Sequence, residues 1–130
     1  MMGFLNKSAN QAKFLAGTLP TPPPDGFYHG TAAGREFSWK GKEFTAATAT
    51  GINVFKNTKN YPFKTYLGKG ALDKQTDVLK IDYNLLENPW YVRLILDEIV
   101  QVNDNEYLGK MLIKIIPGYP FALGYFTLKK

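Results

Sequence analysis

Residues 92–129 read VRLILDEIVQV-NDN-EYLGKMLIKII-PGYP-FALGYFTLK, and this stretch decides the fold. Its first two segments are long and rich in apolar residues. They are separated by residues 103–105, whose Asn and Asp types suit the left-handed backbone of a hairpin turn. Residues 117–120 contain two prolines and a glycine, which favour a second tight connection. The stretch therefore predicts a three-strand antiparallel meander over 92–102, 106–116 and 121–129.

Shorter segments upstream show the same alternation with a period of two. Leu79, Ile81 and Tyr83 share one face of a predicted strand, and polar side chains occupy the other face. Glycines inside the segments, such as Gly51 and Gly109, fit the bends that a closed sheet requires. The chain is therefore predicted to be mainly β, an antiparallel barrel of about seven strands. The upstream strands are expected over 26–35, 44–55, 62–68 and 78–84.

The N-terminal part of the chain has a different character. Residues 4–16 place apolar side chains near helical spacing and end at Gly17, which predicts a short amphipathic helix. Residues 19–26 include four prolines, which predict a stiff, extended connector. The predicted organisation is a helix and proline-rich connector over 1–25, covering one end of the barrel or packing on its surface, and a β-barrel domain over 26–130.

The composition limits the chemistry. The chain has 130 residues, the size of one domain, and it contains no cysteine, so disulfides and thiol catalysis are excluded. The single histidine, His29, leaves no cluster typical of zinc, and neither a metal nor another cofactor is predicted. The sequence also lacks a serine nucleophile elbow and a phosphate-binding glycine loop, which argues against hydrolases and nucleotide-dependent enzymes.

Charge and hydropathy indicate the location and the kind of partner. The net charge is +5, but the lysines are scattered along the chain, so nucleic acid is not predicted as a partner. No segment approaches the ~20 apolar residues of a membrane span. Residues 1–17 are too polar for the apolar core of a signal peptide. A cytoplasmic protein without a membrane span is therefore predicted.

Four short motifs follow one another in an order that resembles a known family. They are GFYHG at 26–30, WKGKEF at 39–44, a strand–acidic turn–strand unit at 96–109, and FALGYF at 121–126. In this order they resemble a family of small bacterial proteins of uncharacterised function that opens with Gly-x-Trp-x-Gly, a mark also of lipocalins and other calycin barrels. Tyr28 stands where that motif has tryptophan. The resemblance implies a lipocalin-like barrel with a ligand cavity, and it implies no catalytic residue.

The strand predicted over 92–102 determines which polar group faces the barrel interior. Its more apolar face comprises Leu94, Leu96, Glu98, Val100 and Val102. We expect this face to point inward, which would place Glu98 on the inner wall as an acid–base group with a raised pKa. The alternative assignment places Arg93 and Asp97 inside as a pair.

Further side chains are candidates for contact with a ligand. Arg93 or Arg35 offers a planar guanidinium for a carboxylate such as that of a fatty acid. His29, on the strand face opposite Tyr28, is a candidate general base or haem ligand, and Asn53 is a candidate polar handle. The catalytic candidates are Glu98, Asp97 and His29. The predicted ligand-binding residues, whose aromatic members could instead fill the core, are Arg93, Tyr28, Trp90, Tyr83, Tyr107, Met111, Phe121 and Tyr125.

The predicted function is the binding of a hydrophobic or amphipathic small molecule in the barrel cavity. Two alternatives stay open at this point. One is a proton-transfer enzyme (an isomerase, cyclase or dehydratase) that uses the same cavity, which requires a carboxylic acid or His29 beside it. The other is a non-catalytic protein-interaction domain whose barrel is filled by its own side chains.

Overall fold

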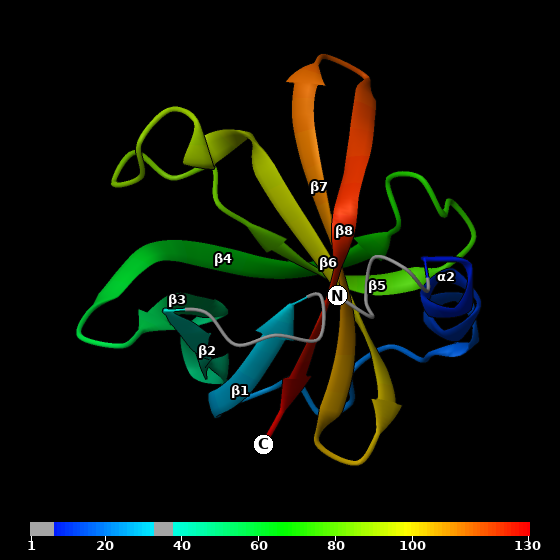
Figure 1. Ribbon diagram of the computed structural model, residues 1–130, viewed down its shortest axis with the longest axis horizontal. Helices are drawn as coiled ribbons and strands as arrows, with labels where there is room; N and C mark the ends of the chain where they lie inside the picture. The colour runs from blue at the N-terminus through cyan, green and yellow to red at the C-terminus, as the bar shows by residue number, and fades with distance from the viewer. Residues whose placement is uncertain (1–6, 33–37) are drawn as a thin grey trace.

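The computed structural model describes residues 7–32 and 38–130 (Figure 1). The described chain is mainly β and has one short N-terminal helix, as predicted. The helix is α2 (Lys7–Ala16), and two short 3-10 turns are η1 (Ala46–Thr48) and η2 (Val92–Leu94). The strands are β1 (Gly26–Ala32), β2 (Trp39–Thr45), β3 (Thr50–Phe55), β4 (Lys59–Lys69), β5 (Asp77–Asp82), β6 (Ile95–Asn103), β7 (Glu106–Ile116) and β8 (Tyr119–Lys129).

The eight strands form one closed antiparallel barrel in the order β1 to β8. Each strand pairs with the next along the chain, and the last strand returns to the first. This closing seam runs from the pair His29↔Lys129 to the pair Ala32↔Phe126. The β7–β8 hairpin, orange to red in Figure 1, projects from the barrel. The predicted antiparallel barrel is therefore confirmed.

The segment predicted as one strand over 44–55 is two strands. A 3-10 turn at Ala46–Thr48 and a left-handed backbone at Ala49, with φ of 54°, reverse the chain between β2 and β3. Residues 46–49 read AATA and carry none of the Gly, Pro, Asn or Asp residues that usually mark a turn. The strand count is therefore eight rather than about seven, and β2 begins at Trp39, well before the predicted start.

Helix α2 packs on the outer surface of the barrel rather than over an end. Its Phe14 is fully buried, and it packs in one cluster with Val78, Val100, Leu108 and Tyr125. Figure 1 shows the helix, in blue, at the side of the barrel. Residues 4–6 of the predicted helix, and residues 33–35 of the first predicted strand, lie outside the described part of the chain.

Aromatic rings fill one half of the barrel interior. Tyr28 packs edge-on against Phe44 and Tyr107, with centroid distances of 5.7 and 5.3 Å. Phe63 continues the chain of rings, 5.4 Å from Phe44 and 5.6 Å from Tyr83. Edge-to-face pairs at these distances stabilise beyond the area that they bury. This packed half closes the inner end of the hollow half.

The face assignment made for β6 is wrong. Ile99 belongs to the interior cluster together with Ile81 and Leu128, whereas Val100 belongs to the apolar group beneath α2 that contains Phe14. Because side chains alternate along a strand, Asp97 points into the barrel and Glu98 points outward. The face of β6 that carries Leu96, Glu98 and Val100 is more apolar because helix α2 covers it. Its apolar composition therefore indicated that it is buried, but not that it is buried on the outside of the barrel.

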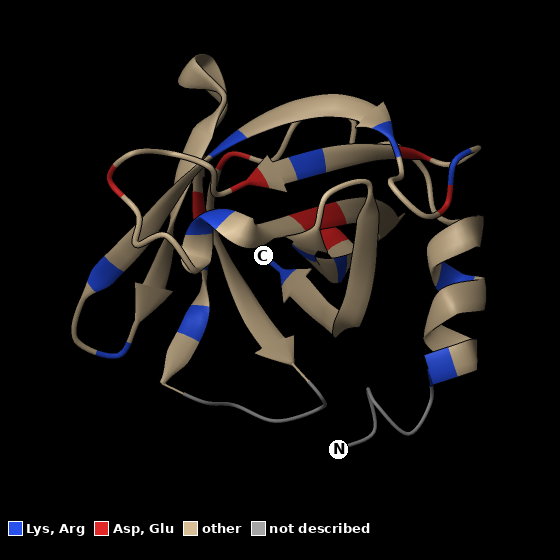
Figure 2. Cartoon of the chain, turned by 90° about the horizontal axis from the view of Figure 1, so that it is seen from above, with Lys and Arg blue, Asp and Glu red and all other residues tan. Residues whose placement is uncertain are grey.

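Two surface features bear on the predicted location and partners. No helix among the described residues is long and apolar enough to cross a membrane. Lys and Arg positions, blue in Figure 2, are spread along helix, strands and loops and interspersed with acidic positions. The cytoplasmic location and the absence of a nucleic-acid partner stay predictions.

Candidate functional site

One end of the barrel contains a cavity of about 530 Å³. It lies where β1 and β3 end and where β2 and β6 begin. Ligand pockets typically enclose about 300–1,000 Å³, so the space suits one small organic molecule. The residues that line the wall are Ala32, Trp39, Phe55, Tyr61, Tyr91, Val92, Ile95, Met111, Leu123, Gly124, Tyr125 and Phe126.

The inner end of the cavity is polar. Four side chains meet there, namely Lys42, Asn53, Tyr83 and Asp97, and all four are buried. Lys42 Nζ lies 2.9 Å from Asn53 Oδ1 and 3.2 Å from Asp97 Oδ2, and it also donates to the Tyr83 hydroxyl. We call these four residues the inner cluster. An apolar wall with a few convergent polar groups is the usual construction of a small-molecule site.

Local backbone features place Lys42 in this position. The β2–β3 register shifts between Trp39 and Gly41, and alternation beyond the bulge puts Lys42 on the same inward face as Phe44. Gly41 has φ of 149°, and a Cβ there would lie 2.0 Å from the carbonyl oxygen of Tyr28. Glycine is therefore required at the bulge that aims Lys42 into the barrel.

Trp39 is held by a second glycine. A Cβ at Gly30 would lie 2.3 Å from the Trp39 ring, so the indole lies directly against the backbone of β1. In this position Trp39 Nε1 donates to Asn53 Oδ1 at 2.9 Å, and the ring packs edge-on against Phe126 at 6.0 Å. Trp39 thus joins the apolar wall of the cavity to its polar end.

Burial shifts the protonation equilibria of the inner cluster. It lowers the pKa of Lys42, although the charge of Asp97 opposes the shift. Burial raises the pKa of Asp97, again opposed by its partner Lys42, and it raises the pKa of Tyr83 well above the usual range. Lys42 Nζ also lies 5.1 to 5.5 Å from four aromatic centroids. Rings at such distances attract a cation and partly replace its lost water.

A second buried carboxylate lies on the outer side of the same strand. Glu98 Oε2 accepts hydrogen bonds from Lys80 Nζ at 2.8 Å and from the backbone N–H of Ala71 at 2.9 Å. Lys110 forms an ion pair with Asp73 close by. Gln11 of helix α2 donates to the Asp73 carboxylate at 2.7 Å. We call Glu98, Lys80, Lys110 and Asp73 the outer cluster, and it ties the helix to the barrel.

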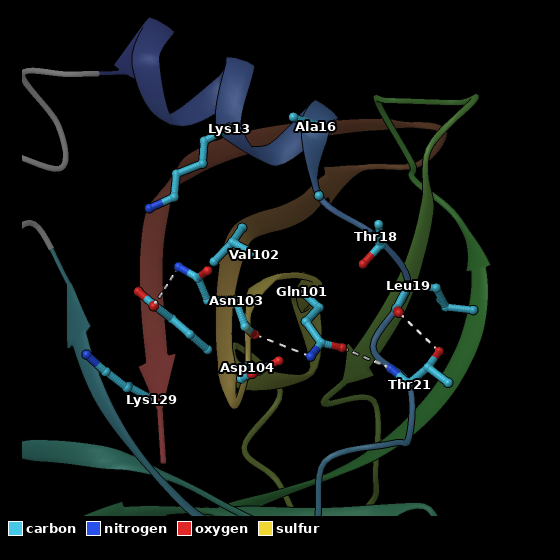
Figure 3. A pocket seen from close by; sticks show the side chains of 12 residues that line it. Lys13, Ala16, Thr18, Leu19, Thr21, Gln101, Val102, Asn103, Asp104 and Lys129 are labelled. Atoms are coloured by element: carbon cyan, nitrogen blue, oxygen red, sulfur yellow. Dashed lines mark hydrogen bonds between the residues drawn. The ribbon is translucent and has the colours of Figure 1, made fainter.

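A larger hollow of about 910 Å³ lies outside the barrel, between the segment after α2, the end of β6 and the start of β7. Figure 3 shows its side chains, which bond mostly to the neighbouring backbone rather than converge on a common point. Gln101 accepts from the backbone N–H of Thr21 and donates to the carbonyl of Asn103. This hollow has no buried charged group, so the barrel cavity is the better candidate site.

The structure separates the predicted ligand-binding residues into three groups. Tyr83, Met111 and Tyr125 border the cavity, although the Tyr125 ring packs against Phe14 on the outer side. Tyr28 and Tyr107 fill the packed half of the barrel. Trp90 and Phe121 are exposed and Arg93 is half-buried, and none of these three lines the cavity.

The predicted charged candidates also differ in place. Asp97 lines the cavity, whereas His29 is exposed on the outward face of β1, opposite the buried Tyr28. Arg93 Nε donates to Asn84 Oδ1 at 2.9 Å. Arg93 lies in the 3-10 turn η2 before β6, so the inward–outward alternation of β6 side chains does not extend from Asp97 to Arg93. Arg35 lies outside the described residues. No group of three His, Cys, Asp or Glu side chains in the described chain is placed to hold a metal.

Sequence reasoning found Asn53 and Asp97 but missed Lys42 and Trp39. A usable signal was present, because Lys42 is two residues from Phe44 and therefore shares its face in any strand.

Comparison of this chain with models of protein families, with curated proteins and with solved structures finds no match. The inference of function therefore depends on the cavity itself, and the relation to calycin families stays a prediction.

Proposed function

We propose that this protein binds a hydrophobic or amphipathic small molecule in the barrel cavity. The observation that supports this most directly is the space of about 530 Å³, with a mostly apolar wall and the inner cluster at its polar end. Burying about 200 Å² of apolar ligand surface contributes roughly 5 kcal/mol, so the wall supplies affinity. The inner cluster supplies orientation, because a polar group that enters it must match the hydrogen bonds already there.

Cavity filling tests the proposal. Ile95→Trp places a large ring on the cavity wall, and Ile115→Trp places the same ring on a surface position that is 61% exposed. Native mass spectrometry after mild purification and thermal shift with a panel of fatty acids, polyphenols and aromatic compounds would be applied to both variants. We expect a bound molecule, or stabilisation by an added compound, in the parent and in Ile115→Trp but not in Ile95→Trp. No stabilisation of the parent by any apolar compound would contradict the proposal.

A second candidate function is proton transfer on a bound molecule. One observation favours it: Asp97, whose pKa burial raises, lies beside an apolar cavity, which suits a general base. The expected result is exchange of a carbon-bound proton of a bound ketone with deuterated solvent, measured by NMR and lost in Asp97→Asn. Binding ranks first, because every donor of the inner cluster already has a partner and none is open to stabilise an oxyanion.

A further inference from the structure

We propose that the cavity selects molecules that carry an uncharged hydrogen-bond donor, such as a phenol or an aromatic alcohol, and rejects the corresponding carboxylates. The donor would bind Asp97. This inference rests on the proposed binding function and gives it a ligand class. It follows from matching each donor and each acceptor of the inner cluster with its partner.

The donors of the inner cluster are fully used. Lys42 Nζ donates to Asn53 and to Tyr83, and its third contact is the ion pair with Asp97 Oδ2 at 3.2 Å. The amide of Asn53 donates to the Tyr61 carbonyl at 3.1 Å and to the Tyr83 hydroxyl at 2.9 Å. The hydroxyl of Tyr83 donates to Asp97 Oδ2 at 3.2 Å. An incoming carbonyl or carboxylate would therefore find no open donor among these residues.

The acceptors have one vacancy. Asn53 Oδ1 accepts from Trp39 and Lys42, and the Tyr83 oxygen accepts from Lys42 and Asn53. Asp97 Oδ2 accepts from Lys42 and Tyr83. Asp97 Oδ1 is buried and has no partner among the described residues. A buried carboxylate oxygen without a donor is costly, so a ligand that supplies a donor would gain a charge-assisted hydrogen bond.

Charge gives the same selectivity. Lys42 and Asp97 form an ion pair, so the inner cluster is neutral as a whole. A ligand carboxylate would bring an unbalanced negative charge into an apolar space next to Asp97, and it would lose its water while Lys42 is already paired with Asp97. A neutral hydroxyl avoids both costs. The carboxylate-binding role predicted for Arg93 is not needed, since Arg93 does not line the cavity.

The contact requires a movement of the Asp97 carboxylate. Asp97 lines the cavity, but Oδ1 is shielded from solvent in the present arrangement. Rotation about the Cβ–Cγ bond of a carboxylate is soft, so the contact requires a turn of this group that brings Oδ1 to the cavity side. Trp39, Tyr61 and Phe126 border the same space, and aromatic rings pack well against a flat aromatic ligand. Phenols and aromatic alcohols therefore match both ends of the site.

Three naphthalene probes of one shape test the selectivity: 2-naphthol, 2-naphthoate and 2-methylnaphthalene. We would measure their dissociation constants by titration calorimetry or by quenching of tryptophan fluorescence near neutral pH. We expect 2-naphthol to bind about 10- to 100-fold more tightly than 2-methylnaphthalene, which is the effect of one hydrogen bond to a charged group. We expect 2-naphthoate to bind most weakly of the three.

Two variants tie the preference to Asp97. In Lys42→Met/Asp97→Leu the whole ion pair becomes apolar, so we expect 2-naphthol to lose its advantage over 2-methylnaphthalene while binding of the latter persists. Glu98→Gln alters the neighbouring carboxylate on the outer side and should leave the preference unchanged. Equal binding of 2-naphthol and 2-methylnaphthalene by the parent, as expected if water alone satisfies Asp97, would overturn the inference but not the binding function. Tightest binding of 2-naphthoate would also overturn it, and no binding of any probe would count against both proposals.

Discussion

Asp97 and Glu98 are neighbours in β6, and they occupy two different kinds of interior. Each is a buried carboxylate with a lysine partner, and each has one oxygen without a partner among the described residues. Asp97 faces the barrel cavity, and its partner Lys42 is 3% exposed. Glu98 faces outward, is covered by the chain itself, and has a partner, Lys80, whose side chain is 13% exposed.

The difference shows that burial alone does not define a functional site. The outer cluster is closed by protein, because the backbone at Ala71 and the helix residue Gln11 bond to its carboxylates directly. The inner cluster is covered by protein on one side and borders the barrel cavity on the other. Polar groups next to an apolar cavity can still gain a partner, whereas the outer groups already stabilise the attachment of a helix.

Among the variants that test the difference between the two carboxylates, Asp97→Leu should have the largest effect on stability. It leaves the ammonium of Lys42 buried without a counter-charge, which should lower the free energy of unfolding by about 3–5 kcal/mol. Burial lowers the pKa of Lys42, so the unfolded chain binds more protons between that lowered pKa and the ordinary lysine value near 10.4. The stability of the variant should therefore rise with pH across this window, as measured by urea unfolding at several pH values.

The control for that experiment is Lys42→Met/Asp97→Leu. Replacing both partners of a buried ion pair by apolar side chains is often neutral or stabilising, by about 1–4 kcal/mol. The double variant should therefore recover most of the stability that the single variant loses. A double variant as unstable as Asp97→Leu would show that the pair itself, rather than an unbalanced charge, holds this part of the barrel together.

On the outer side, Phe14→Ala should have the next largest effect. The ring is fully buried and lies 4.8 Å from Lys110 Nζ, so its removal leaves a cavity between α2 and the barrel. We expect the free energy of unfolding to fall by roughly 2–4 kcal/mol. The usual cost of Phe→Ala in a core is limited here because the helix can detach from the barrel instead of leaving the cavity unfilled. Hydrogen exchange should then show loss of protection in α2 before the barrel strands. Equal loss of protection in β2 and β3 would contradict the separation of the two interiors.

Glu98→Gln should cost less than Asp97→Leu, at about 1–2 kcal/mol. The glutamine oxygen can still accept from Ala71 N–H, and Lys80 can turn toward water because its side chain is partly exposed. The measurement is again urea unfolding, with Asp97→Leu in the same series. A cost for Glu98→Gln equal to that of Asp97→Leu would remove the distinction between the two clusters.

The smallest effect concerns Tyr66, which is 44% exposed on β4. Partial burial and the hydrogen bond to Asp82, at 2.8 Å, raise its pKa to about 12. Because the folded state holds this proton more tightly, its contribution is complete below about pH 10 and is lost as pH rises through about 12. Tyr66→Phe should remove that titration step from the absorbance of phenolate and change stability at neutral pH by less than about 1 kcal/mol.

The sequence predicted the positions of strands correctly where the strands are long and where Asn, Asp, Gly or Pro residues mark the turns between them. Alternation and the turn residues at 103–105 and 117–120 located β6, β7 and β8. The β2–β3 turn was missed because Ala49 adopts a left-handed backbone without a residue type that signals it. That conformation is held by the surrounding strand pairs, and pairing between strands is not a local property of the sequence.

The site was less accessible to sequence reasoning for a related reason. Both faces of β6 are buried, one by the barrel and one by α2, so counting apolar residues could not distinguish inside from outside. Asn53 and Asp97 were identified as polar residues within strands, but their meeting with Lys42 depends on the bulge at Gly41 and on the closure of the sheet. Arg93 was misplaced because a 3-10 turn, rather than a strand, precedes Ile95.

The seam between β1 and β8 sets the order in which the molecule can be completed during synthesis. Gly30 pairs with Leu128 and Ala32 pairs with Phe126, so this edge of β1 stays unpaired until β8 has been synthesised. Until then a nascent chain lacks Leu123 and Phe126, which form part of the cavity wall. The cavity that we propose as a binding site is therefore complete only after β8 has been translated.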